Sequence, residues 1–363
     1  MSVIIGVFVA NISPRYPVKI ILFIGNGMGN GQVSADYYYN HHSPFPRFPA
    51  TGMLSTHPDG DRWITDSAAS ATALATGVKV KPGTLAVDEN GNKLPSVMEI
   101  AQSRHKGTGI VVTTSVTQPT PAAFTTHFAH WGRENEIAEQ QQRAKLDVLM
   151  GGGLRFFQNN TGADSNLTEL MSKAGYTFVA TQTQLEILDT EKTDKLIGLF
   201  AIEALKQASM RSLSLAMMTE KAVNVLDNYR KGFFLMVEGS QIDWRCHEKD
   251  GDGLIDEMLD FDNAIRWALD YQMTHPELLI VVLGDHETGG LALVEDLNAR
   301  GNIRIQFLST EHSANICPVF AKGPGQDDFI GFHDIEDIGK ILINLTGKRH
   351  NFLSRFVLHS RHE

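Results

Sequence analysis

The sequence has few cysteines and no cluster of basic residues. Only Cys246 and Cys317 occur among 363 residues, so no disulfide framework is implied, and each is expected to be a buried thiol. The formal net charge at pH 7 is -10, and no block of Lys and Arg is present that could follow a phosphate backbone. Nucleic acid is therefore not an expected partner, whereas the acidic excess suits a protein that concentrates metal cations.

The sequence also lacks a long apolar run, a low-complexity linker and an internal repeat. Its N-terminus, residues 1–11, holds a short apolar run with no Lys or Arg before it. This run is too short to cross a bilayer, and without a basic start it is at best a clipped or imperfect export signal. We expect no stable membrane insertion, a residual export signal or an N-terminal arm at residues 1–17, and a single domain at residues 18–363.

The composition is that of an ordinary soluble enzyme, with 42% hydrophobic and 20% charged residues. Largely apolar runs predict buried strands at 18–24, 109–114, 146–150, 233–237 and 278–283. Helices are expected at 96–104, 214–229, 254–271 and 335–345. This alternation predicts an α/β fold with a large, mainly parallel central sheet and helices on both faces, a three-layer sandwich.

The segment 63–77 is rich in small residues and contains the first candidate site residue, Ser67. One interpretation is a tightly packed helix start, in which Asp66 or Ser67 caps the free backbone N–H groups. The other is that the Ser67 hydroxyl, at the positive end of a helix dipole, is a nucleophile beside a bound phosphate. The segment alone favours packing, so the rest of the chain must supply a group that activates Ser67.

Metal-capable side chains recur where the predicted strands end. A single Asp–His pair is more often an ordinary hydrogen-bonded pair than a metal site, but the ends of such strands converge on one rim of an α/β sheet. The recurrence therefore predicts one shared site. Its candidate ligands are Asn26, Thr120, Glu238, Asp243, His247, Asp285, His286 and His312.

The residue types indicate which metals these ligands would suit. Asp243 and His247 are four residues apart, so a helical turn would bring them within about 6 Å of each other on one face. Mixed imidazole and carboxylate ligation suits zinc, whereas an all-oxygen set such as Glu238 with Thr120 suits magnesium. Two zinc ions could lower the pKa of a serine hydroxyl or a water and take charge from a leaving oxygen.

Six motifs, in this order along the chain, resemble those of the alkaline phosphatases. They are IGNGMG (24–29), TDSAASAT (65–72), TPAA (120–123), VEGSQID (237–243), GDHETGG (284–290) and EHS (311–313). The resemblance implies an alkaline-phosphatase-like catalytic domain that hydrolyses small-molecule phosphate monoesters to an alcohol and inorganic phosphate. It also implies a homodimer that is periplasmic or secreted.

The same resemblance implies a role for each candidate residue. Ser67 would be the nucleophile and would form a phosphoserine intermediate. The ligands implied for two zinc ions and one magnesium ion are Asp243, His247 and His312 for the zinc on the leaving-group and water side, Asp285 and His286 for the zinc that activates the serine, and Thr120 and Glu238 for the magnesium.

Two positions depart from the family pattern. Where the family normally has an Asp that bridges the second zinc and the magnesium, this chain has Asn26. Asn keeps a carbonyl oxygen but loses the negative charge and one donor oxygen, so we expect reduced metal occupancy and turnover. An ungapped count from Thr120 places Trp131 where the family has its phosphate-clamping Arg, and Trp cannot bind two phosphate oxygens. Arg133, two residues further on, is the candidate replacement if the helix start is shifted.

Gln118 and Trp244 are two further side chains expected near the site. Gln118 is neutral at a position near the magnesium where the family also has Asp or His, and Trp244 either lines the substrate entrance or packs as an ordinary aromatic.

Two other function classes remain open. Asn26 and Trp131 would support a degenerate family member that binds phosphate or metal. A phosphodiesterase, phosphonate hydrolase, mutase or sulfatase of the same superfamily is the other alternative, and the sequence context of Ser67 argues against it.

Overall fold

The computed structural model describes residues 16–40, 42–158, 166–299 and 302–348. Of the expected export signal or arm at residues 1–17, only residues 16 and 17 are therefore described. None of the helices in these ranges is long and apolar enough to cross a membrane.

The molecule is built on one sheet with the strand order β14-β2-β13-β8-β1-β7-β3-β4-β6-β5. Every pair of neighbours in this sheet is parallel except those of β13, which runs antiparallel to both β2 and β8. The strands are β1 (Lys19–Gly25), β2 (Ala50–Ser55), β3 (Gly107–Ser115), β4 (Val148–Gly152), β5 (Thr177–Val179), β6 (Leu196–Leu199), β7 (Phe233–Gly239), β8 (Leu278–Gly284), β13 (Cys317–Lys322) and β14 (Gly331–Asp334). The predicted α/β fold with a mainly parallel sheet is confirmed.

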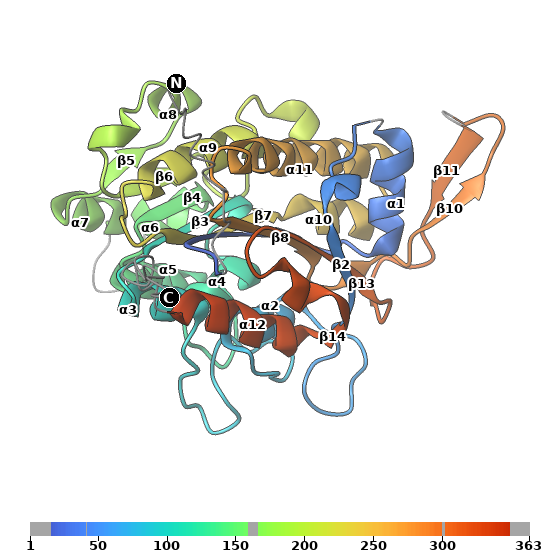
Figure 1. Cartoon of the computed structure of the whole chain (residues 1–363), viewed down its shortest axis with the longest axis horizontal. Coiled ribbons are helices and arrows are strands. Elements are labelled where there is room, and N and C mark those ends of the chain that lie inside the picture. Colours follow the sequence, from blue (N-terminus) through green and yellow to red (C-terminus); the bar gives the residue numbers. More distant parts are fainter. Residues whose placement is uncertain (1–15, 41, 159–165, 300–301, 349–363) are drawn as a thin grey trace, which may run out of the picture.

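Helices cover both faces of this sheet, as Figure 1 shows, with α9 and α11 on one side and α2, α3 and α12 on the other. The helices are α1 (Asn30–Tyr39), α2 (Ser67–Thr76), α3 (Val97–Ser103), α4 (Pro119–Thr125), α5 (Glu134–Ala144), α6 (Leu154–Gln158), α7 (Leu167–Lys173), α8 (Gln182–Glu186), α9 (Leu215–Leu226), α10 (Gln241–His247), α11 (Gly251–Gln272) and α12 (Ile335–Gly347). The three-layer arrangement is thus the predicted one.

Strand β1 is apolar from Ile20 onward because both of its faces are covered. Successive side chains of a strand point to opposite faces. Ile20, Leu22 and Ile24 pack in the core formed with α2 and α12, and Ile21 and Phe23 pack in the core formed with α9 and α11. All five are almost fully buried. A strand covered on both faces has no position left for a polar residue until it ends, and the first polar residue after β1 is a candidate ligand.

The four central strands bring the candidate residues to one edge of the sheet. β8, β1, β7 and β3 are consecutive and parallel, and Gly25 at the end of β1 pairs with Gly239 on one side and Gly284 on the other. The residue after β1, the residue after β8 and Glu238 near the end of β7 are therefore neighbours in space. The chain leaving β3 reaches the same edge through α4, which carries Thr120.

Two small antiparallel sheets complete the fold. One is β9 (Glu287–Thr288) with β12 (His312–Ser313), in which His312 pairs with Thr288. The other is β10 (Ala292–Glu295) with β11 (Ile303–Gln306), which projects to the right in Figure 1. Both cysteines are buried free thiols, as predicted.

Candidate active site

A pocket of about 280 Å³ at the carboxyl ends of the central strands gathers most of the predicted site residues. It is lined by Asn26, Asp66, Ser67, Ala68, Thr114, Gln118, Pro119, Thr120, Trp131, Glu238, Ser240, Asp243, Trp244, His247 and His312. Asp285 and His286 are fully buried, and His286 contacts Ser67, which lines the pocket. Arg133 is the one candidate that neither lines this pocket nor is buried.

Ser67 is the first residue of α2, and its position is fixed by the preceding aspartate. Asp66 caps the helix by accepting a hydrogen bond from the backbone N–H of Ala69 at 2.8 Å, and its other oxygen accepts one from Gly83 at 2.6 Å. The small residues of α2 allow close packing against α12, where a Cβ on Gly339 would lie 2.2 Å from the carbonyl oxygen of Ala73. The packing interpretation of this segment is correct for α2, and it leaves the Ser67 side chain free to face the pocket.

The Ser67 hydroxyl meets a neutral histidine. Ser67 Oγ lies 3.1 Å from His286 Nε2, and burial lowers the pKa of His286 to about 3, so the ring is uncharged and can present a lone pair. His286 Nε2 also lies 3.5 Å from Asp285 Oδ2. Burial, with nearby Glu238 and Asp243, raises the pKa of Asp285 well above its ordinary value.

Two oxygen atoms of the candidate ligands have no hydrogen-bond partner among the described residues. They are Asn26 Oδ1 and Asp285 Oδ2, and both are buried. The other carboxylate oxygen of Asp285 accepts hydrogen bonds from the backbone N–H groups of Gly27 and His286, each at 3.0 Å. An unpartnered buried oxygen is costly, and Asp285 Oδ2 lies 3.5 Å from His286 Nε2, so Asp285 and His286 form a carboxylate–imidazole pair that suits a cation such as zinc.

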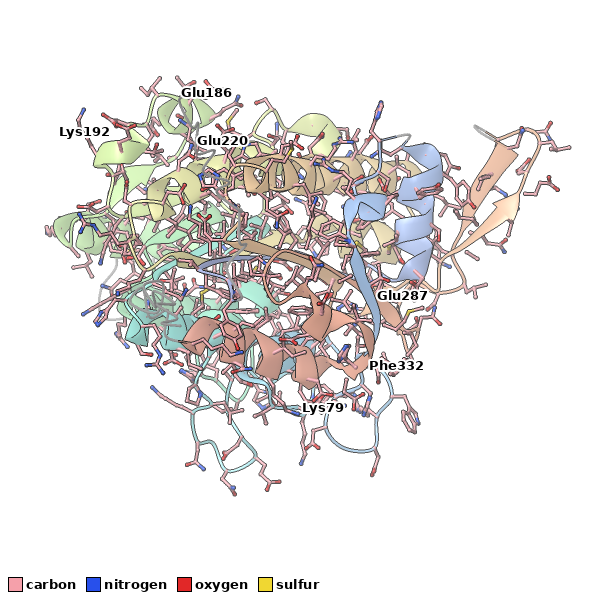
Figure 2. All side chains as sticks on the ribbon, viewed as in Figure 1. Lys79, Glu186, Lys192, Glu220, Glu287 and Phe332 are labelled. Atoms are coloured by element: carbon pink, nitrogen blue, oxygen red, sulfur yellow. The ribbon has the colours of Figure 1, made fainter. Side chains whose placement is uncertain are left out.

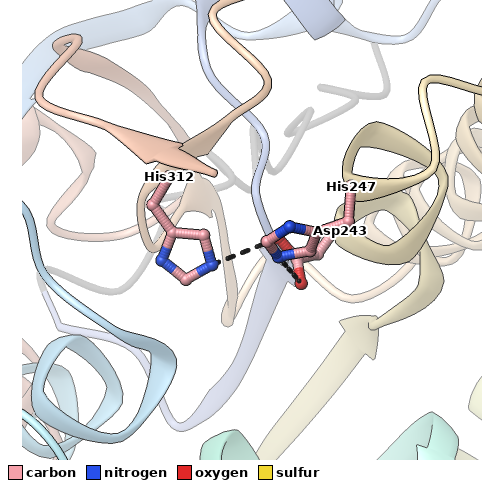
Figure 3. A group of neighbouring side chains, drawn as sticks. All are labelled: Asp243, His247 and His312. Atoms are coloured by element: carbon pink, nitrogen blue, oxygen red, sulfur yellow. Dashed lines mark ion pairs between the residues drawn. The ribbon is translucent and has the colours of Figure 1, made fainter. Parts of the chain in front are cut away.

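A second donor set consists of Asp243, His247 and His312, and Figure 3 shows the two imidazoles facing the carboxylate. The nitrogen and oxygen atoms concerned lie within 4.8 Å of one another. Asp243 Oδ2 is 3.2 Å from His247 Nε2, and Asp243 Oδ1 is 3.6 Å from His312 Nε2. Asp243 and His247 lie one turn apart on α10, as their spacing predicts. Among the described residues this is the one group of three such side chains close enough to hold a metal ion.

The backbone orients both of these histidines. His247 Nδ1 is hydrogen-bonded to the carbonyl oxygen of Thr310, and His312 Nδ1 to that of Thr65 at 3.0 Å. A carbonyl accepts, so Nδ1 carries the proton and Nε2 is left to face Asp243, which is the arrangement typical of metal-ligating histidines. The hydrogen bond to Asp243 raises the pKa of His247 to about 9.

The carboxylate of this set stays ionised. Burial raises the pKa of Asp243, but the hydrogen bond from His247 and the nearby His286 and His312 outweigh it and bring the pKa to about 2. Thr288 Oγ1 donates a further hydrogen bond to Asp243 Oδ1. The donor set therefore combines a carboxylate with two imidazoles, which is a zinc-type combination.

Glu238 and Thr120 meet around Asn26. The side-chain nitrogen of Asn26 donates hydrogen bonds to Glu238 Oε1 at 2.8 Å and to Thr120 Oγ1 at 3.2 Å. Ser240 Oγ donates to Glu238 Oε2 at 2.8 Å. Burial raises the pKa of Glu238 to about 6. The residues expected to bind magnesium are thus close together, and hydrogen bonds join them.

Trp131 and Arg133, the two positions considered for the phosphate-clamping arginine, lie in different surroundings. Trp131 lines the pocket and is 39% exposed. Arg133 points to solvent, where it forms an ion pair with Glu136 at 2.5 Å and lies over the ring of Phe128 at 5.5 Å. Helix α5 begins at Glu134, directly after Arg133. None of the described residues that line this pocket is Lys or Arg, and Gln118 and Trp244 do line it.

Glu287 is a supporting residue that the sequence analysis did not single out. It is buried, and Figure 2 labels it next to α1. Its carboxylate accepts hydrogen bonds from Gln32 of α1 at 3.1 Å, from the backbone of Leu291 at 3.0 Å and from the Ser313 hydroxyl. These bonds fasten β12 to β9 and hold His312 beside the pocket. Its place directly after Asp285 and His286, in the motif GDHETGG, was the available indication of this role.

A family model and individual relatives of known function identify the same protein family. The sequence model described as "Alkaline phosphatase" matches residues 18–302. Alkaline phosphatase 4 of Bacillus subtilis is 38% identical over 91% of this chain and 89% of its own length. Streptomycin-6-phosphate phosphatase of Streptomyces griseus is 30% identical over 87% of each chain.

Solved structures agree with this result. The alkaline phosphatase of the Antarctic bacterium TAB5 superposes with a TM-score of 0.86 and 32% identity, over 92% of this chain and 99% of that one. A mutant of the same protein has magnesium bound in a site called M3. The chain therefore belongs to the alkaline phosphatase family, metal-dependent enzymes that hydrolyse phosphate monoesters.

Proposed function

We propose that this enzyme hydrolyses small-molecule phosphate monoesters through a phosphoserine formed on Ser67, with two zinc ions in its pocket. The observation that carries the proposal is the placement of Ser67 Oγ at the start of α2, 3.1 Å from a neutral His286 and in the same pocket as the Asp243, His247 and His312 set. A helix N-terminus favours the negative charge of a phosphate, and a hydroxyl there is well placed for attack on phosphorus.

The residues fit the zinc ions that the family resemblance implies. Asp243, His247 and His312 would hold one ion, and Asp285 with His286 the other. When bound, such ions supply positive charge that lowers the pKa of the serine hydroxyl and of water and stabilises the leaving oxygen.

The chain's own groups determine the geometry of the reaction. Asp66 holds the start of α2, so that Ser67 Oγ meets the phosphorus in line with the leaving alcohol. The bond from Ser67 to phosphorus forms as the bond to the alcohol oxygen breaks. Water then attacks the phosphoserine and releases the Ser67 oxygen, which gives inorganic phosphate with net retention at phosphorus.

Other properties are proposed from the family resemblance. One ten-stranded sheet contains strands from β1 to β14, which supports a single catalytic domain over residues 18–363. The family is usually homodimeric and exported, and we propose both for this chain, with a periplasmic or secreted location.

Two substitutions support a second candidate function, a phosphate or metal binder with weak turnover. Asn26 removes a negative charge from the donor set, and Trp131 stands in the pocket where the family's Arg is expected.

One assay separates these functions. The purified chain is stripped of metal and reloaded with zinc, and its hydrolysis of p-nitrophenyl phosphate and bis(p-nitrophenyl) phosphate is compared. We expect zinc-dependent hydrolysis of the monoester and much slower hydrolysis of the diester. Similar rates on both substrates would contradict a monoesterase, and no turnover with zinc bound would favour the binder.

A further inference from the structure

The amide of Asn26 has a defined orientation. Its nitrogen donates to Glu238 Oε1 at 2.8 Å and to Thr120 Oγ1 at 3.2 Å, and all three side chains are buried. If the amide were flipped, its oxygen would face a carboxylate oxygen, and two acceptors would meet without a proton between them. The hydrogen bonds therefore fix Nδ2 towards Glu238 and Thr120 and leave Oδ1 on the other side, where it has no hydrogen-bond partner among the described residues.

The position between Thr120 and Glu238 offers a poor donor set for magnesium. Of the four described residues expected at this position, Glu238 is the only carboxylate, because Asn26, Thr120 and Gln118 are neutral. Both oxygens of Glu238 already accept hydrogen bonds, one from Asn26 and one from Ser240 at 2.8 Å. Magnesium needs oxygen ligands in nearly octahedral geometry, whereas here an N–H group points at the oxygens that would have to bind it.

An amide also cannot serve two cations at once. A carboxylate carries two acceptor oxygens and can bridge two metal ions, but an amide has one oxygen and an NH₂ group that no cation can use. Turning the oxygen of Asn26 towards Glu238 would set it against the carboxylate oxygen Oε1 and would point the NH₂ group to the side where Oδ1 now lies. Either orientation therefore favours one cation at the expense of the other.

We propose that the Asn26 amide replaces the third metal ion, so that this enzyme has a two-cation centre and binds no magnesium at Thr120 and Glu238. This departs from the single magnesium that the family resemblance predicts. The proposal rests on the proposed function only in taking the two cations to be zinc. The hydrogen bonds of Nδ2 hold Glu238 and Thr120 in place, and Oδ1 accepts no hydrogen bond from the described residues.

Metal content tests the proposal independently of turnover. The full chain and the variant Asn26→Asp are stripped with a chelator, reloaded with zinc, equilibrated with magnesium, and analysed for both metals by mass spectrometry. Asn30→Asp is the matched control, because it makes the same change at an exposed position outside the pocket. We expect about one magnesium per chain in Asn26→Asp, and well under about a tenth in the other two proteins.

Thermal unfolding gives a second readout that does not depend on catalysis. Asn26→Asp places a second buried carboxylate beside Glu238, so magnesium should raise its Tm, while the Tm values of the wild type and Asn30→Asp should not respond. Stoichiometric magnesium in the wild type would overturn the proposal, and so would an Asn26→Asp variant that neither binds magnesium nor is stabilised by it. Loss of zinc binding or of monoester hydrolysis in the wild type would instead count against the proposed function, whatever the magnesium result.

Discussion

Replacing Trp131 with Arg should strengthen phosphate binding, because it would introduce a basic side chain among the residues that line the pocket. None of those residues is Lys or Arg, and Arg133 is held at the surface by its ion pair with Glu136. A phosphate ester in this pocket therefore has no guanidinium partner among the described lining residues.

The size of the effect follows from the position of Trp131. A hydrogen bond to a charged group contributes about 1.5–3 kcal/mol, and 1.36 kcal/mol is a factor of ten in rate or binding. Trp131 is 39% exposed, so water screens part of this interaction. We therefore expect Trp131→Arg to raise kcat/KM for p-nitrophenyl phosphate about tenfold and to tighten inhibition by inorganic phosphate by a similar factor.

Two control variants separate charge from shape. Trp131→Ala removes the indole without adding a cation and should not reproduce the gain. Arg133→Ala should leave KM within about twofold of the wild type, because the Arg133 side chain lies outside the pocket. The reasoning would be refuted if Trp131→Arg left both kcat/KM and phosphate inhibition unchanged, or if Arg133→Ala raised KM strongly.

Three further predictions concern stability and metal binding. Asp66→Ala loses two hydrogen bonds from backbone N–H groups and should lower the free energy of unfolding by about 1–3 kcal/mol and reduce turnover, measured by urea unfolding and by assay. Zinc must displace the proton that keeps His247 charged below its pKa of about 9, so zinc affinity of the stripped protein should rise with pH from 7 to 9, measured by chelator competition; a flat profile would contradict this. Burial lowers the pKa of Lys106 to about 8, below its unfolded value, so the unfolded state binds more protons above pH 8. The free energy of unfolding should therefore gain up to about 3 kcal/mol between pH 8 and 10.5, and Lys106→Met should lose this gain.

The parts of the fold that sequence patterns predict are those fixed by burial on both faces. The central residues of β1, β7 and β8 are apolar because helices cover both sides of the sheet, and the polar residues of these strands stand at or near their ends. This is why the candidate ligands could be recognised from their positions. The helix α1 was not predicted, because only Gln32, Ala35 and Asp36 of its residues are buried, so its sequence carries little helical periodicity.

The orientation of individual side chains could not be predicted in the same way. The direction of the Asn26 amide depends on Glu238 and Thr120, which come from strands and helices far away in sequence. The position of His312 depends on the pairing of β12 with β9, two short strands without a recognisable pattern. Arg133 is only two residues from Trp131, yet one side chain lies in solvent and the other in the pocket.

Trapping the covalent intermediate tests the central claim most directly. The zinc-loaded enzyme is mixed with a phosphate monoester, quenched in acid, digested and analysed by peptide mass spectrometry. The account predicts one phosphoryl group on the peptide that contains Ser67, and none in Ser67→Ala, which should also lose monoester hydrolysis while retaining zinc. Turnover with no phosphoryl group on Ser67, or continued turnover of Ser67→Ala, would contradict it.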